Sequence, residues 1–321
     1  MMNDAIRAFP AQFIYEPQIV GEFDPKKYNQ FIIVGMGGSH LAADLLKETR
    51  ADLNIQVYSD YGLPVINTDN VSKTLVILSS YSGNTAETLS AGEEALKRGV
   101  GLAAVAVGGK LLEFAQTNSI PFIELPNLGI QPRSAFGFSL RALLKLVGAE
   151  DDLVLSKEVA RMDVSELEKQ GQALALILQN RVPVIYAEIR HRSIAYNWKI
   201  KFNETAKIPA FCNVVPEFNH NEMNGFDVID STRSLSDKFA FIFIRSKTDH
   251  PQNKIRFDVS QKMYEQRNFP VYVIDLIGVT VYEQVARALM LADWTAVYLS
   301  EYYGTEAEKV PMVEEFKKLI A

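Results

Sequence analysis

The stretch Ser79–Thr85 reads S-S-Y-S-G-N-T, so four Ser/Thr hydroxyls, a glycine and an amide fall within seven residues. It follows the apolar run Thr74–Leu78, which predicts a buried strand, and precedes Ala86–Leu96, which has the pattern of a helix. The first backbone N–H groups of a helix have no partner inside it, and the helix dipole adds partial positive charge there. Both effects favour an anion, and phosphate is the usual one.

The hydroxyls of this stretch exceed what a helix N-terminus needs, because one Ser or Thr is enough for an N-cap. Ser80, Ser82 and Thr85 together therefore predict a phosphate-binding loop rather than a cap alone. The position supports this interpretation, since ligands of open α/β sheets bind where strands end and helices begin. A plain helix cap stays the alternative at this point.

A second polar loop, Gly35-Met-Gly-Gly-Ser39, lies between the strand candidate Asn29–Val34 and a helical pattern from His40 to Leu46. It is not a dinucleotide fingerprint, because the third glycine of G-x-G-x-x-G is missing: His40 stands three residues after Gly37, and Leu41 three residues after Gly38. Glycines still let backbone approach a ligand closely. Two such loops on neighbouring strands could hold one phosphate from two sides, and a tight turn with a Ser cap is the alternative.

Further stretches combine acid–base or cationic groups with prolines and amides. In isolation, a Glu beside a helical pattern or a Lys near a C-terminal helix end is usually just a solvated charge. The stretches are Pro132–Ala135 (P-R-S-A), Asn203–Lys207 (N-E-T-A-K), Pro216–Glu222 (P-E-F-N-H-N-E) and Pro311–Lys317 (P-M-V-E-E-F-K).

Taken together, these stretches resemble a known family. The two polar loops look like those of sugar isomerase (SIS) domains, which bind the phosphate of a phosphosugar. The stretches around Glu204 and His220 narrow the resemblance to the bifunctional phosphoglucose/phosphomannose isomerases of the phosphoglucose isomerase superfamily. The resemblance spans nearly the whole chain, and it implies aldose–ketose isomerisation of glucose 6-phosphate and fructose 6-phosphate, with mannose 6-phosphate as a further substrate.

The resemblance also implies a role for each candidate residue. Glu204 is the base that moves a proton between C2 and C1 through a cis-enediol, and His220 opens the sugar ring. Lys317 assists ring opening or binds substrate, and Arg133 stabilises the enediolate charge. The two loops bind the phosphate, through Gly37, Gly38, Ser39, Ser80, Ser82 and Thr85.

The family resemblance further implies a homodimer, in which His220 reaches the active site of the other subunit.

Two positions depart from the family pattern. Val310 stands where the family tends to carry a Thr linked to tolerance of the mannose epimer, which puts the phosphomannose activity in more doubt. Thr205 replaces the second Asn of N-E-N-A-K and keeps a hydrogen-bonding group.

Composition sets the broad class of protein. The chain of 321 residues is 48% hydrophobic and 22% charged, as expected of a globular protein with two domains. Its net charge of -6 and the absence of a basic block disfavour nucleic acid as a partner. Neither a signal peptide nor a membrane span is predicted, and the single cysteine, Cys212, fits a cytoplasmic setting and a packing role.

No cofactor and no required metal are expected from the sequence. His220 and Glu222 could place two ligands together, and some unrelated phosphomannose isomerases use zinc. The other histidines, His40, His191 and His250, are scattered without ligand spacing.

The elements that must position these residues alternate along the chain. In the first half, the strand candidates Asn29–Val34, Ile55–Tyr58, Thr74–Leu78, Gly101–Val107 and Pro121–Leu125 are separated by helical patterns. In the second half, the helical patterns Val164–Gln179 and Tyr282–Tyr303 enclose the strand candidates Val182–Ala187, Phe239–Ile244 and Pro270–Asp275. The pattern predicts two doubly wound, mainly parallel α/β domains of flavodoxin-like type, residues 1–150 and 151–321.

Other functions remain open at this stage. A non-catalytic phosphosugar-binding regulator would keep the hydroxyl loop without needing Glu204 or His220, but Met1–Tyr28 is too short for the usual helix-turn-helix. A glucosamine 6-phosphate synthase would need an N-terminal glutaminase domain. An isomerase of another phosphosugar differs from the leading hypothesis only in its substrate.

Overall fold

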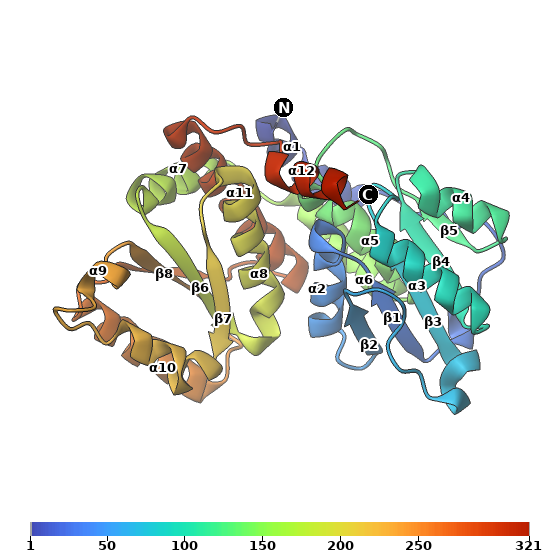
Figure 1. Cartoon of the computed structure of the whole chain (residues 1–321), viewed down its shortest axis with the longest axis horizontal. Helices are drawn as coiled ribbons and strands as arrows, with labels where there is room; N and C mark the ends of the chain where they lie inside the picture. The colour runs from blue at the N-terminus through green and yellow to red at the C-terminus, as the bar shows by residue number, and fades with distance from the viewer. Residues whose placement is uncertain (1, 321) are drawn as a thin grey trace. The chain divides into compact units, whose positions relative to one another are not determined.

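The computed structural model describes residues 2–320, which divide into two compact units. The first unit comprises Arg7–Met162, and the second joins the residues before Arg7 to the chain from Asp163 onward. Both units are parallel-sheet α/β structures, which confirms the predicted fold class (Figure 1). None of the described helices combines the length and apolar character that a membrane crossing requires.

Helix α1 (Met2–Arg7) comes first in the chain. The first unit then contains β1 (Gln30–Val34), α2 (Leu41–Thr49), β2 (Asn54–Tyr58), β3 (Thr74–Ser79), α3 (Ala86–Lys97), β4 (Gly101–Ala106), α4 (Gly109–Thr117), β5 (Phe122–Glu124), α5 (Phe136–Leu146) and α6 (Glu150–Ser156). The second unit contains α7 (Leu167–Leu178), β6 (Val182–Glu188), α8 (Arg192–Lys201), β7 (Phe211–Val215), α9 (Arg233–Ser236), β8 (Phe239–Arg245), α10 (Pro251–Glu265), β9 (Val271–Asp275), α11 (Val281–Tyr303) and α12 (Pro311–Leu319).

The first sheet has the strand order β2-β1-β3-β4-β5, with all pairs parallel. Helices cover both faces of a parallel sheet, so its central strands read as continuous apolar runs, and every residue of β3 is buried. Helices α3 and α4 pack on one face, while α2 and α5 lie on the other (Figure 1). The chain leaves β1 toward β2 on one side and returns to β3 on the other, so the carboxyl ends of β1 and β3 form a topological switch point.

The second sheet repeats this arrangement with the order β7-β6-β8-β9, again all parallel. Its switch point lies between β6 and β8. Helix α10 packs on one face over a cluster of aromatic rings, in which Tyr264 stacks on Phe241 with ring centroids 4.1 Å apart. Helix α8 covers the other face and is itself packed against α11, which also contacts α7.

The boundary between the units falls after Met162 rather than near residue 150. The charged segment that follows α5, where the boundary was predicted, folds into α6 and a 3₁₀ turn that pack on the first unit. The fully buried guanidinium of Arg141 holds it there. Its Nη1 donates to the carbonyl of Leu153 at 2.7 Å and to Ser156 Oγ at 2.8 Å.

A buried ion pair joins α8 to α11 in the second unit. Lys201 Nζ lies 2.6 Å from Asp293 Oδ1, and both side chains are almost completely buried. Since Lys201 ends α8, this pair fixes the point at which the chain leaves the helix. A buried charge that loses its partner is strongly destabilising, whereas replacing both charges with apolar groups is often tolerated.

We therefore expect Lys201→Met alone to lower the free energy of unfolding of the second unit by about 3–5 kcal/mol. The double substitution Lys201→Met with Asp293→Leu should recover part of this loss, because no unpaired charge is left behind. Urea unfolding followed by tryptophan fluorescence measures the effect selectively, since Trp198 and Trp294 are the only tryptophans and both belong to this unit. Equal loss in the single and double variants would contradict a dominant role for the charge pair.

Candidate active site

The loop after β3 is closed by its own hydroxyls. Ser80 Oγ lies 2.8 Å from Thr85 Oγ1, and the backbone N–H of Gly83 donates to Ser80 Oγ at 3.1 Å. Thr85 is the N-cap residue of α3, yet its side chain makes no capping hydrogen bond. The loop therefore leaves the first turn of α3 without a side-chain cap, which is the geometry of an anion-binding helix N-terminus.

Gly83 and Asn84 fix this loop against the start of α4. Gly83 has a φ of +70°, and a Cβ at this position would lie 1.8 Å from the carbonyl oxygen of Gly108. The backbone N–H of Lys110 donates to Asn84 Oδ1 at 3.2 Å. Only glycine fits at residue 83, because any side chain there would overlap the backbone of Gly108.

The loops after β1 and β3 are hydrogen-bonded to each other at the switch point. Ser79 Oγ donates to the carbonyl of Ser39 at 3.0 Å, and the N–H of Tyr81 donates to Ser39 Oγ at 2.9 Å. The expectation that the two polar loops lie side by side is therefore met. The buried hydroxyls of Ser39 and Ser80 build the loops, while Gly37 and Ser82 are exposed at the surface.

Gly38 brings a third segment to the same place. A Cβ on Gly38 would lie 2.7 Å from the backbone nitrogen of Arg133, so the two backbones are in direct contact. Arg133 belongs to a 3₁₀ turn, Pro132–Ser134, and is almost completely buried. The sequence-predicted phosphate residues and the predicted cation thus belong to one cluster in the first unit.

Glu204 is half-buried on a π-helical turn, Phe202–Ala206, that directly follows α8. The turn widens the helix, and such turns occur frequently at functional sites. The next residue, Lys207, is left-handed with a φ of +59°, and its ammonium group donates to the carbonyl of Glu204. Asn203 Nδ2 donates to the carbonyl of Ile208 at 3.0 Å, so the motif's own side chains hold the turn that carries Glu204.

His220 is exposed on a 3₁₀ turn after β7, beside a cavity of about 470 Å³ that Arg267 also lines. The motif residue Glu222 ties this segment to the sheet. It accepts from Tyr186 Oη at 2.5 Å and from Asn213 Nδ2 at 2.6 Å. Burial, together with Glu222, raises the pKa of Tyr186, so the phenol stays a proton donor to this carboxylate.

Lys317 lies on α12, of which no residue is buried. This helix exposes Met312, Val313, Phe316 and Leu319 at helical spacing, followed by Ile320. Glu204, His220 and Lys317 therefore stand on three separate elements of the second unit. The described contacts place Glu204 with α8 and α11, and the turn that carries His220 with β7.

Cys212 lines a cavity of about 320 Å³ on the outer side of β7, beside Arg192 and Lys199. Burial raises the pKa of its thiol against the opposing effect of these two cations. A thiol with a raised pKa is a poor nucleophile near neutral pH, which agrees with a packing role for this residue.

Comparison with known proteins places these motifs in a family. The family model for the bacterial phospho-glucose isomerase C-terminal SIS domain matches residues 167–320. A bifunctional phosphoglucose/phosphomannose isomerase of Aquifex aeolicus is 34% identical over 98% of this chain and 96% of its own length. The chain belongs to the bifunctional phosphoglucose/phosphomannose isomerase family. A second family member, from Caldicellulosiruptor bescii, is 33% identical over 91% of this chain and 90% of its own length.

The family assignment agrees with a structural comparison. Tagatose-6-phosphate ketose/aldose isomerase of Escherichia coli matches with a TM-score of 0.67, covering 95% of this chain and 94% of its own. At 17% identity this likeness concerns the fold alone. Within the phosphoglucose/phosphomannose isomerase family, a sugar phosphate is the substrate class.

The contact at Gly38 predicts a selective binding defect. Gly38→Ala should separate the loop after β1 from the turn that carries Arg133, because the added methyl would overlap backbone atoms. Overpacking of this kind costs about 1–3 kcal/mol, so we expect affinity for 6-phosphogluconate to fall by about ten-fold. Isothermal titration calorimetry measures it, with Gly225→Ala as a matched control, since nothing lies within 4 Å of a Cβ there. Equal affinity in the two variants would remove this contact from the binding site.

Proposed function

We propose that this chain interconverts glucose 6-phosphate and fructose 6-phosphate, and also mannose 6-phosphate, through a cis-enediol intermediate. The observation that carries the proposal is the construction of the Glu204 turn. The chain is similar to isomerases along nearly its whole length. Within N-E-T-A-K, Glu204 is the side chain suited to removing a proton from carbon, and it is half-buried. Its neighbours Asn203 and Lys207 are engaged in holding the turn.

The phosphate is the part of the substrate that the first unit binds. Backbone N–H groups at the start of α3 and the hydroxyls of Ser82 and Thr85 offer donors at an electropositive helix end. The Ser39 and Ser80 hydroxyls keep the loops in place, and Gly37 and Gly38 let backbone approach the ligand. Binding energy from this remote group orients the sugar for the reaction at C1 and C2.

The chemistry then needs a proton moved at oxygen and a proton moved at carbon. His220, which is exposed and free to meet a sugar, takes the ring-opening step with Lys317. Glu204 removes the proton from C2 of the open aldose and returns it to C1, and the reverse path gives the aldose. Because C2 becomes planar in the enediol, return of the proton to either face of C2 yields glucose 6-phosphate or mannose 6-phosphate. Arg133 supplies the positive charge that the enediolate needs.

A homodimer completes this proposal. His220 is exposed, and α12, which carries Lys317, presents an uncovered apolar face. An uncovered apolar stripe of this kind is typical of an interface. A second copy of the chain that covers α12 would bring these residues to a shared site. We place the enzyme in the cytoplasm.

Glu204→Gln tests the role of the base. The amide keeps the shape of the side chain but cannot accept a proton, so kcat should fall by about 10²–10⁴-fold. Affinity for 6-phosphogluconate should stay within about two-fold of wild type, since the phosphate loops are untouched. The matched control is Glu265→Gln on α10, whose carboxylate accepts a surface hydrogen bond from Gln261. Wild-type turnover in Glu204→Gln would remove this residue from its role.

Complementation tests whether two subunits share one site. Glu204→Gln and His220→Ala should each be inactive alone, because each lacks one proton-transfer group. If His220 acts across the interface, refolding the two variants together forms mixed dimers in which one site has both groups. Recovery of about a quarter of wild-type activity is then expected from random pairing of subunits that make C2 dimers. No recovery, with mixed dimers verified by tagged pull-down, would place both groups in the same subunit's site.

A further inference from the structure

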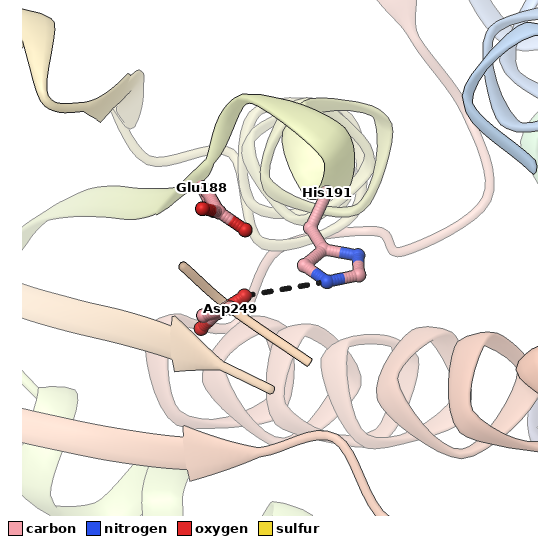
Figure 2. Close-up of side chains that lie close together, drawn as sticks. All are labelled: Glu188, His191 and Asp249. Atoms are coloured by element: carbon pink, nitrogen blue, oxygen red, sulfur yellow. Dashed lines mark ion pairs between the residues drawn. The ribbon is translucent and has the colours of Figure 1, made fainter. Parts of the chain in front are cut away.

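A second cluster of ionisable side chains lies at the switch point of the second sheet, where β6 and β8 end. Glu188 is the last residue of β6, His191 lies three residues later, and Asp249 follows β8 (Figure 2). The two strands are neighbours in parallel register, with Ala187 opposite Ile244. This is the same place in the topology that the candidate phosphate loops occupy in the first sheet, and it is where ligands of open α/β sheets bind.

The three side chains converge on a common point. One ligand atom of each lies within 4.8 Å of the others, and His191 Nε2 is 3.4 Å from Asp249 Oδ1. Two donors bound to one zinc ion at 2.0–2.2 Å are themselves about 3.4 Å apart in tetrahedral geometry. Glu188 and Asp249 are only 2% and 3% exposed, so the two carboxylates are held close together away from water.

Each carboxylate has one oxygen that accepts hydrogen bonds and one oxygen that faces a cationic or imidazole nitrogen. Glu188 Oε1 accepts from the N–H of His250 at 2.9 Å and from Asn253 Nδ2 at 2.7 Å, and Asp249 Oδ2 accepts from the N–H of Ser246 at 2.7 Å. The remaining atoms, Glu188 Oε2, His191 Nε2 and Asp249 Oδ1, are buried and make no hydrogen bond to the described residues. Their contacts are ion pairs, with Arg190 Nε 3.0 Å from Glu188 Oε2 and His191 Nε2 3.4 Å from Asp249 Oδ1. Outer hydrogen bonds that orient one oxygen while the other faces the centre are the usual surroundings of metal ligands.

Buried polar atoms without hydrogen bonds are costly, and three of them facing one point suit a shared cation. Two carboxylate oxygens and one imidazole nitrogen form a mixed ligand set, which suits Zn²⁺ or Mn²⁺ better than the all-oxygen sites of Ca²⁺ or Mg²⁺. We propose that Glu188, His191 and Asp249 bind one divalent transition-metal ion, which joins the ends of β6 and β8.

Arg190 is the natural competitor for this ion. Its Nε lies 3.0 Å from Glu188 Oε2, on a side chain that is half exposed. The guanidinium offers one positive charge to the same oxygen that the metal would use. Removing it should free Glu188 for the ion, while the metal-free protein loses stability because the buried carboxylate loses its cation.

The ion's role is structural rather than catalytic. His191 precedes α8 and Glu204 follows it, and a helix of ten residues is about 15 Å long. The ion would therefore stabilise the second unit from the far end of the helix that carries the proposed base. The site lies within that unit and does not depend on the function proposed above.

The test uses the full-length protein, stripped of metal with EDTA and dialysed. Calorimetric titration with Zn²⁺ should show one ion bound per chain. Thermal unfolding followed by Trp198 and Trp294 should shift upward with Zn²⁺ or Mn²⁺, and hardly at all with equal Mg²⁺, because binding to the native state alone stabilises it. No binding, or stabilisation by acid in place of metal, would overturn the proposal in favour of a protonated His191 paired with Asp249.

Variants assign the ion to these residues. Asp249→Asn should weaken Zn²⁺ binding by more than about ten-fold, the loss that even a residue supporting a ligand typically causes. Arg190→Gln should tighten binding, and it keeps the test decisive if Asp249→Asn fails to fold. His40→Asn is the control for zinc bound elsewhere, since His40 pairs with Asp44 in the first unit. Equal affinity in wild type, Asp249→Asn and Arg190→Gln would exclude this site.

Discussion

The structure depends on one topological constraint, the parallel sheet whose chain leaves two neighbouring strands in opposite directions. At such a point the loops after both strands meet, and backbone groups at the helix starts face the same space. In the first sheet this brings Ser39 against Tyr81 and joins the two polar loops. In the second sheet it brings Glu188 and His191 against Asp249. The same geometry thus brings together the proposed phosphate loops in one unit and a cluster of carboxylates and imidazole in the other.

The second unit adds a different feature, the π-helical turn that follows α8. The buried pair of Lys201 and Asp293 fixes the last residue of the helix against α11. The π-helical turn follows at once, and Lys207 satisfies the carbonyl that the turn exposes. The position of Glu204 is therefore set by packing and by backbone hydrogen bonds. A general base works only when it is held within hydrogen-bond reach of its proton, so this support suits the role proposed for Glu204.

Much of the fold could be predicted from sequence patterns, and the elements that were missed have physical reasons. The continuous apolar run of β3 predicted a buried central strand. Helix α10 was not predicted from the sequence, because most of its side chains are polar and it buries only Phe257, Ser260 and Tyr264. The loop with Ser82 could be predicted since its residues are contiguous. The grouping of His191 with Asp249 could not, because residues from different strands meet only in the folded sheet.

The central claim is that one enzyme forms two epimeric aldoses from one ketose. The most direct measurement supplies fructose 6-phosphate to the purified protein and follows glucose 6-phosphate and mannose 6-phosphate separately by NMR. The account predicts both products, each abolished in Glu204→Gln, together with deuterium at C2 of both in D₂O. Glucose 6-phosphate alone would contradict the bifunctional activity and direct attention to Val310. Neither product, with phosphosugar binding retained, would contradict the isomerase itself and favour a regulator or another sugar.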